Sequence, residues 1–195
     1  FSIKEKKYLI KNNIQKKKLI FTSTPTEISK PILKNIKKYD LIFAGSEWIQ
    51  NKISLKWIIK NIISKIDNLS FLVLGVKINF RSYVKNISNK DYNKKYFKKS
   101  KLGIALIKEG TGRKVKIFEM LSYGLPVITN LNLEQYGLKN NKHYVLEKRK
   151  LKIINTIKEL IVNKRKRNNL SLNAHRWSRK NTYYKFAFKK INYLL

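Results

Sequence analysis

The chain has 195 residues, of which 43% are hydrophobic and 12% aromatic, so it is long enough and apolar enough to form a packed core. Its 45 lysines and arginines against 11 acidic residues give a formal net charge of +34. It contains no cysteine, which excludes a disulfide framework, a thiol nucleophile and a cysteine-ligated zinc, and no apolar run approaches the ~20 residues that a membrane-spanning helix needs.

The positive charge by itself favours a basic nucleic-acid-binding module, because each basic residue that neutralises a phosphate releases a counterion and adds affinity. Only 7 of the 45 basic residues are arginines, however, and base readout and bidentate phosphate binding favour arginine over lysine. The abundance of Lys, Ile and Asn is equally typical of compositional drift. We therefore expect no specific nucleic acid as a partner, and a peripheral attraction to anionic membranes as a side effect of the charge.

Short apolar segments alternate along the chain with segments of helical periodicity, which indicates βαβ units. A helical stretch, Ser2–Asn13, comes first. The expected strands are Lys18–Thr22, Asp40–Ala44, Ser70–Val76, Leu102–Ile107, Pro126–Thr129 and His143–Leu146. The expected helices are Ile53–Ile66, Asp91–Lys99 and Arg113–Tyr123, and only helical patterns follow Lys150. We predict a single α/β domain with a doubly wound, mostly parallel sheet and a helical C-terminal tail.

The tryptophans and histidines are better explained by packing than by chemistry. Trp48, Trp57 and Trp177 are interpreted as core or domain-packing residues and not as stacking platforms for a ligand. His143 precedes an expected strand and is interpreted as structural, and His175 lies in a basic helix and is expected to be exposed. The distance between the two histidines in the sequence gives little support to a metal site, and none is expected.

One segment combines two glycines, two lysines and a glutamate, in the order Gly110-Thr111-Gly112-Arg113-Lys114-Val115-Lys116-Ile117-Phe118-Glu119. It follows an expected strand and opens a helix, so the glycines let backbone N–H groups approach a ligand and the helix start attracts a phosphate. Lys114 and Lys116 would be unfavourable beside that positive helix end unless an anion bound there. Glu119 is placed to accept hydrogen bonds from sugar hydroxyls. On spacing alone, an ordinary turn with a surface salt bridge explains the segment as well.

The same segment, continued by Tyr123-Gly124-Leu125-Pro126-Val127-Ile128-Thr129, resembles the nucleotide-sugar signature of the family-four (group 1) glycosyltransferases. That signature runs Gly-x-Gly, Lys-x-Lys, Glu-Ala-Met and Gly-x-Pro-Val-Val. Segments outside it are also similar to the C-terminal domain of the family, namely Leu41–Ser46, Leu72–Gly75, Leu102–Ala105 and His143–Leu146. The chain departs from the pattern at Thr111, where many relatives have glutamate, at Leu106, where proline is usual, and at Glu134, where glycine is usual.

The resemblance implies a two-domain architecture, called GT-B, in which two Rossmann-like halves face a cleft. The C-terminal half holds the nucleotide-sugar donor and the N-terminal half holds the acceptor. Residues 1–17 would then be the end of the interdomain segment and residues 18–195 the donor-binding domain with its C-terminal helices. Because the chain starts at Phe1 without an initiator methionine or a signal-peptide pattern, we expect a fragment that lacks the acceptor domain.

Carried over position by position, the resemblance assigns a donor-binding role to eight residues. Glu119 would bind the ribose hydroxyls of the donor. The motif Gly110-Thr111-Gly112 would offer backbone N–H groups to the diphosphate or the sugar. Lys114 and Lys116 would balance the charge of the diphosphate, so that no metal is needed. Gly45 and Ser46 match the loop that faces the diphosphate from the other side of the cleft.

The resemblance therefore implies a glycosyltransferase whose co-substrate is a nucleoside diphosphate sugar and which needs no separate cofactor. The acceptor would be a glycan, a lipid or a small molecule, the transfer would proceed with retention, and the protein would be cytoplasmic, in peripheral contact with the inner face of a membrane. The fragment alone is expected to be inactive. Two alternatives stay open at this point: the basic nucleic-acid-binding module, and a degenerate, non-catalytic fragment that still folds.

Overall fold

The structure is a computed structural model that describes residues 3–15, 26–28, 37–77, 87–107 and 115–182. Its central feature is a six-stranded sheet with the order β3-β2-β1-β4-β5-β6, in which every neighbouring pair is parallel. The strands are β1 (Tyr39–Ala44), β2 (Phe71–Leu74), β3 (Ile87–Lys90), β4 (Ser100–Ala105), β5 (Val127–Thr129) and β6 (Val145–Leu146). The predicted parallel sheet is confirmed, and the expected strand Lys18–Thr22 lies outside the described residues.

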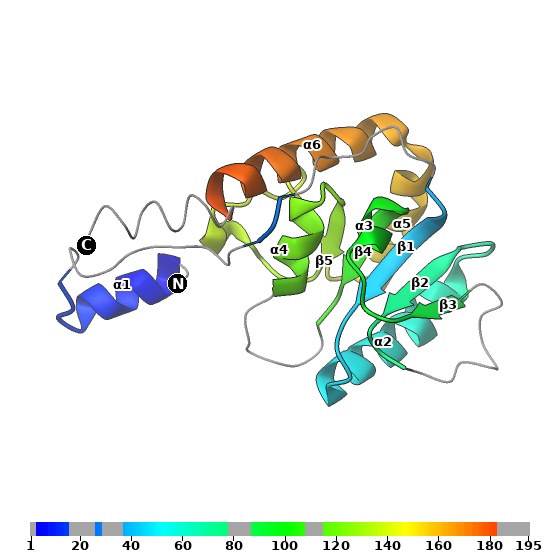
Figure 1. The fold of residues 1–195 in the computed structure, drawn as a ribbon, viewed down its shortest axis with the longest axis horizontal. Coiled ribbons are helices and arrows are strands. Elements are labelled where there is room, and N and C mark those ends of the chain that lie inside the picture. The colour runs from blue at the N-terminus through cyan, green and yellow to red at the C-terminus, as the bar shows by residue number, and fades with distance from the viewer. Residues whose placement is uncertain (1–2, 16–25, 29–36, 78–86, 108–114, 183–195) are drawn as a thin grey trace.

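Helices cover both faces of the sheet, so the sheet is doubly wound (Figure 1). The helices and 3-10 turns are α1 (Ile3–Lys11), α2 (Ile49–Asn61), η2 (Ile63–Lys65), α3 (Lys95–Lys98), α4 (Val115–Ser122), η3 (Glu134–Tyr136), α5 (Lys150–Val162) and α6 (Lys164–Asn181). The predicted tail of helices is confirmed as far as the end of α6. The Rossmann-like α/β architecture thus agrees with the expectation from the sequence.

Alternation along the strands separates the two hydrophobic cores, because successive strand residues point to opposite faces. In β1, Leu41 and Phe43 pack in the core that α2 and α5 cover, whereas Ile42 and Ala44 pack in the core that α3 and α4 cover. Strand β2 repeats the pattern, and all four of its residues are buried. Strands buried on both faces are typical of parallel sheets between two helical layers.

The order of the strands reverses between β1 and β4. From β1 the chain builds β2 and β3 outward on one side, then returns to place β4 on the other side of β1 and continues to β5 and β6. Loops that leave the carboxyl ends of β1 and β4 therefore run in opposite directions and leave a crevice between them, which is where open α/β sheets bind ligands. Gly45 and Ser46 follow β1 directly, so the fold brings one predicted donor loop to this crevice.

Several local expectations were wrong in their details. Helix α2 begins at Ile49, four residues before the predicted start, and α3 is a single turn where a nine-residue helix was expected. Trp48 is 72% exposed and is no part of the core, which leaves domain packing as its predicted role, while Trp57 and Trp177 pack against the core. His175 is buried instead of exposed.

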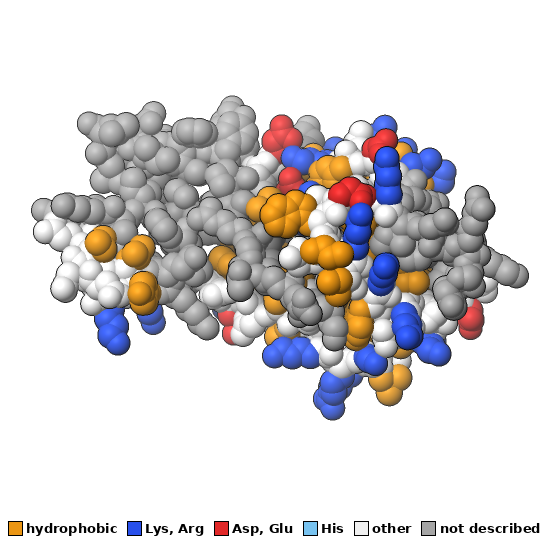
Figure 2. Space-filling model, turned by 90° about the horizontal axis from the view of Figure 1, so that it is seen from below, with side chains coloured by type: hydrophobic (Ala, Val, Ile, Leu, Met, Phe, Trp, Pro, Cys, Tyr) orange, Lys and Arg blue, Asp and Glu red, His pale blue; other side chains and the backbone are white. Residues whose placement is uncertain are grey.

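Lysine and arginine side chains are spread over the face seen in Figure 2, with exposed hydrophobic side chains among them and few acidic ones. In the ranges that the structure describes, no helix is both long enough and apolar enough to cross a membrane.

Candidate functional site

The loop after β1 is tightly packed at the carboxyl edge of the sheet. The Gly45 N–H donates to the Leu74 carbonyl at 3.0 Å, and a Cβ added at Gly45 would meet side-chain atoms of Phe43, Val76 and Asn51 at 3.0–3.1 Å. The Asn51 side chain, in the first turn of α2, donates to the Ser46 carbonyl at 3.0 Å and to its hydroxyl at 3.2 Å. Gly45 and Ser46 are thus held in place by α2 and β2 together.

The loop after β2 touches the loop after β1 through a second glycine. Gly75 has φ +70°, a conformation that residues with a side chain rarely adopt, and its ideal Cβ position lies 2.3 Å from the Gly45 carbonyl oxygen. The same position lies 3.3 Å from Cβ of Tyr92. Gly75 therefore lets three segments meet at the sheet edge, those that follow β1, β2 and β3.

A cavity of about 500 Å³ opens beside these loops, lined by Glu47, Gly75, Val76, Lys77, Lys90 and Asp91. Glu47 is fixed at its rim, because its carboxylate accepts from the Lys77 backbone N–H and pairs with the Lys52 ammonium at 2.6 Å. These contacts, that of Lys52 above all, hold the pKa of Glu47 below its usual range. A cavity of this size is in the range of small-molecule sites.

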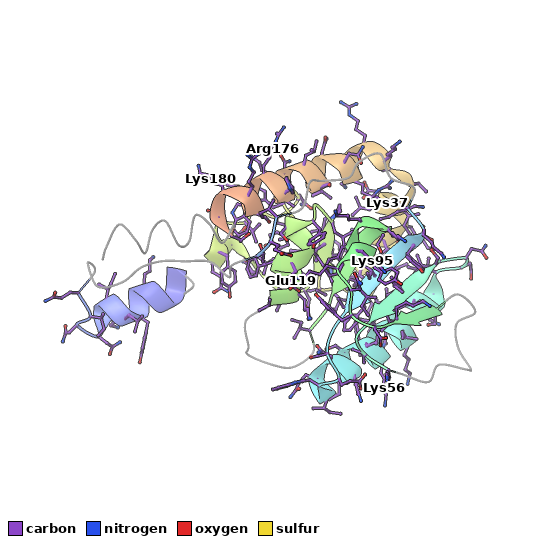
Figure 3. All side chains as sticks on the ribbon, viewed as in Figure 1. Lys37, Lys56, Lys95, Glu119, Arg176 and Lys180 are labelled. Carbon is purple, nitrogen blue, oxygen red and sulfur yellow. The ribbon has the colours of Figure 1, made fainter. Side chains whose placement is uncertain are left out.

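Glu119, the predicted ribose ligand, lies on α4 beside this edge (Figure 3). Only 16% of its side chain is exposed. The Tyr92 hydroxyl donates to its Oε2 at 2.5 Å, and the Lys94 ammonium lies 3.4 Å from its Oε1. Tyr92 and Lys94 come from the segment between β3 and α3, so Glu119 links α4 to the opposite half of the sheet. Burial first, and then the hydrogen bond to Glu119, raises the pKa of Tyr92, which keeps its hydroxyl protonated.

Lys116 lies over the ring of Tyr92, with its Nζ 3.6 Å from the ring centroid, in the geometry of a cation–π contact. It is half-buried, and burial is the main cause that lowers its pKa. The structure therefore brings together Lys116, Glu119, Tyr92 and Lys94. The predicted residues Gly110, Thr111, Gly112 and Lys114 lie outside the described residues.

Sequence reasoning missed Tyr92 and Lys94 as neighbours of the site. They follow β3, a strand that was not predicted, and both lie in the segment Asp91–Lys99 that was expected to form a helix. His143 has the structural role that was predicted for it, because its ring accepts from the Lys139 N–H at 2.8 Å. Within the described part of the chain, no group of three or more His, Asp or Glu side chains could hold a metal ion.

No protein-family model and no curated protein matches the chain in sequence, whereas solved structures match its fold. Sucrose-phosphate synthase from Thermosynechococcus elongatus superposes with a TM-score of 0.74 at 13% identity, covering 99% of this chain and 56% of the synthase. TarM superposes with a TM-score of 0.72 at 15% identity, covering 96% of this chain and 41% of TarM. Anabaena HepE, in a complex with UDP and glucose, superposes with a TM-score of 0.71 at 9% identity, covering 98% of this chain and 60% of HepE.

These structures confirm the fold predicted from the sequence. The chain spans about 41–60% of the length of these three proteins. It has the Rossmann-like fold that recurs in GT-B glycosyltransferases, and nearly all of its length takes part in the match.

Proposed function

We propose that the chain binds a nucleoside diphosphate sugar and holds it for transfer of the sugar to an acceptor. The position of Glu119 carries the proposal. It is a mostly buried carboxylate on the helix that follows the glycine motif, beside the crevice where the strand order reverses. A carboxylate there is an acceptor for the hydroxyl groups of a ribose.

The surroundings of Glu119 support a division of the site into three parts. The ribose would lie at Glu119, and the nucleobase would occupy the cavity that Gly75 and Asp91 line, which is next to Tyr92. The diphosphate would lie between the Gly45–Ser46 loop and the glycine motif before α4, with Lys114 as its cation. The roles of the glycine motif and of Lys114 rest on the sequence alone.

The ligands of the structural neighbours are compatible with this division. The HepE structures were obtained with UDP, with UDP-glucose, and with UDP and glucose, and one TarM structure contains UDP. We propose that a second, acceptor-binding half completes the enzyme, that the acceptor is a glycan, lipid or small molecule, and that transfer proceeds with retention. Lysines and the start of α4 would balance the charge of the leaving diphosphate without a metal.

Calorimetric titration of the 195-residue chain with UDP tests the proposal, with GDP and ADP as parallel probes for the base. Glu119→Gln keeps the shape of the side chain but removes the charge that strengthens hydrogen bonds from ribose hydroxyls. A charge-assisted bond contributes ~1.5–3 kcal/mol, so the affinity should fall roughly tenfold or more. EDTA should leave the affinities unchanged.

The matched control is Glu159→Gln, because Glu159 pairs with Lys166 on the other side of the molecule, between α5 and α6. It should bind as the wild-type chain does. Equal affinity of the wild-type chain and Glu119→Gln for every ribonucleoside diphosphate tested would defeat the ribose assignment.

A further inference from the structure

Tyr92 is held on several sides by contacts that do not involve Glu119. Its ring lies edge-on against Phe97, with the ring centroids 6.3 Å apart at an interplanar angle of 80°. Its Cβ lies close to Gly75, 3.3 Å from the ideal position of a Cβ at that residue. The Lys116 ammonium covers one face of the ring at 3.6 Å from the centroid. The position of the Tyr92 hydroxyl is therefore set by α3, the loop after β2 and α4.

The hydroxyl in turn fixes one oxygen of Glu119. A distance of 2.5 Å is in the range of a short, charge-assisted hydrogen bond between a hydroxyl and a carboxylate. A free glutamate side chain has several rotatable bonds, and a donor whose own position is fixed selects one arrangement of the carboxylate. Lys94 contacts the other oxygen at 3.4 Å, but it is shared with Glu27, whose carboxylate lies 4.0 Å from the same ammonium. The hydrogen bond from Tyr92 therefore defines the position of the Glu119 carboxylate more closely than the ion pair with Lys94 does.

The acceptor capacity of the carboxylate leaves room for a ribose. A carboxylate offers about four lone-pair positions, two on each oxygen. Among the residues that the structure describes, Tyr92 takes one position on Oε2 and Lys94 pairs with Oε1, which leaves one position on each oxygen for a ligand. Two adjacent hydroxyls of a ribose, one for each oxygen, match what is left.

We propose that Tyr92 is a positioning residue that aims the Glu119 carboxylate at the two hydroxyls of the donor ribose, with Lys116 holding the Tyr92 ring. This role rests on the proposed function of the site. It assigns Lys116 to the nucleoside side of the site, where it acts through Tyr92, in place of the diphosphate side that the sequence suggested. A pre-oriented carboxylate loses less conformational entropy when the ribose binds, so its hydrogen bonds contribute more to affinity. The effect of Tyr92 should therefore appear in the ratio of the affinities for a ribose ligand and a deoxyribose ligand.

The test measures this discrimination by calorimetry with UDP and 2′-deoxy-UDP on the 195-residue chain. Tyr92→Phe removes the hydroxyl and keeps the ring on which Lys116 and Phe97 pack. We expect UDP affinity to fall about five- to tenfold and 2′-deoxy-UDP affinity to fall much less, so the ratio of the two affinities drops. Tyr96→Phe, which removes a hydroxyl from the neighbouring aromatic residue on α3, should leave the ratio unchanged and controls for packing.

A double-mutant cycle decides whether Tyr92 acts through Glu119. In the background of Glu119→Gln, Tyr92→Phe should produce little further loss of UDP affinity. Additive losses, or an unchanged or higher affinity ratio in Tyr92→Phe, would overturn the positioning role while leaving the proposed function intact. A wild-type chain that bound UDP and 2′-deoxy-UDP equally well would overturn the ribose assignment itself, and the role of Tyr92 with it.

Discussion

Gly75 and Gly137 are two residues with nearly the same backbone conformation and very different surroundings. Both have positive φ, +70° and +83°. A Cβ at Gly75 would lie 2.3 Å from the backbone oxygen of Gly45, a contact that neither loop can relieve by moving a side chain. At Gly137 the nearest atom is Nε1 of Trp177, 3.8 Å away, which is an ordinary contact. A substitution at Gly137 therefore introduces backbone strain alone, whereas one at Gly75 introduces the same strain and a steric overlap.

We expect Gly137→Ala to lower the free energy of unfolding by ~1–2 kcal/mol, the usual penalty for a side chain in left-handed backbone. Gly75→Ala adds a clash to the same strain and should lower it by ~2–5 kcal/mol. Urea unfolding followed by circular dichroism measures both variants. Equal losses would show that the loops after β1 and β2 are not in contact in solution.

The sequence could single out Glu119 but not the residues that hold it. Glu119 belongs to a contiguous motif of glycines, lysines and a glutamate, whose spacing from a helix start can be recognised without a structure. Tyr92 lies 27 residues earlier and is joined to it only by tertiary packing. Nothing in the local pattern of a lysine-rich segment distinguishes a tyrosine that packs from one that donates a hydrogen bond to a site residue.

At the level of elements, one carboxylate connects three strands at the amino edge of the sheet, opposite the site. Asp40, in β1, pairs with the ammonium of Lys101 in β4 at 2.8 Å. It also accepts from the N–H and the hydroxyl of Ser70, just before β2, at 3.0 Å and 3.1 Å. Burial alone would raise the pKa of Asp40, but the contacts with Lys101 and Ser70 outweigh it and hold the pKa below its usual value.

Because the pKa of Asp40 is lowered in the folded chain, its contribution to stability is present above the unfolded value of ~3.9 and is lost as pH falls through the folded value. Asp40→Asn should reduce the free energy of unfolding by ~1–3 kcal/mol at pH 7. It should also reduce the loss of stability that the wild-type chain shows between about pH 5 and pH 3. Urea titrations at several pH values check this, with the exposed Asp67→Asn as control. A parallel pH dependence in wild type and Asp40→Asn would contradict the role of the cluster.

The elements that could be predicted are those whose own residues carry a recognisable strand or helix pattern. Strands β1 and β4 are apolar runs and were placed within two residues at either end, and α4 has the apolar stripe and the terminal glycine of an ordinary helix. Strand β3 reads Ile87-Ser88-Asn89-Lys90, which is too polar to indicate a strand. It forms at the edge of the sheet by pairing with β2, in a register that begins with Phe71 opposite Ile87. Pairing of this kind is a tertiary effect.

At the scale of the whole molecule, the densest run of basic residues is less available for binding nucleic-acid phosphates than its sequence suggests. Of Lys164-Arg165-Lys166-Arg167, two residues hold the corner between α5 and α6. The Lys166 ammonium bonds the Glu159 carboxylate at 2.7 Å and 3.0 Å. The Arg167 guanidinium donates to the carbonyls of Leu160 and Ile161 at 2.6 Å and 2.9 Å, where it caps the end of α5. Their charge therefore serves the packing of the helices.

We expect binding to DNA or RNA to be weak, blind to sequence and nearly absent at physiological salt. Binding by dispersed lysines is driven by counterion release, so its affinity falls steeply as the salt concentration rises. Fluorescence anisotropy with two labelled oligonucleotides of equal length and different sequence, titrated from low to ~0.15 M salt, provides the measurement. A marked preference for one sequence at the higher salt would favour the nucleic-acid-binding alternative over the glycosyltransferase proposal.

The reversal of strand order also has a consequence for how the chain folds. Lys101 and Asp40, which join β4 to β1, are 61 residues apart in sequence, whereas residues that join β1 to β2 and β4 to β5 are 30 and 24 apart. Loop closure disfavours the longer connection. The two halves of the sheet, β3-β2-β1 and β4-β5-β6, can therefore assemble before β1 pairs with β4. The crevice exists only once β1 and β4 have paired. A ligand bound across the crevice therefore lowers the rate of unfolding and has little influence on the rate of folding.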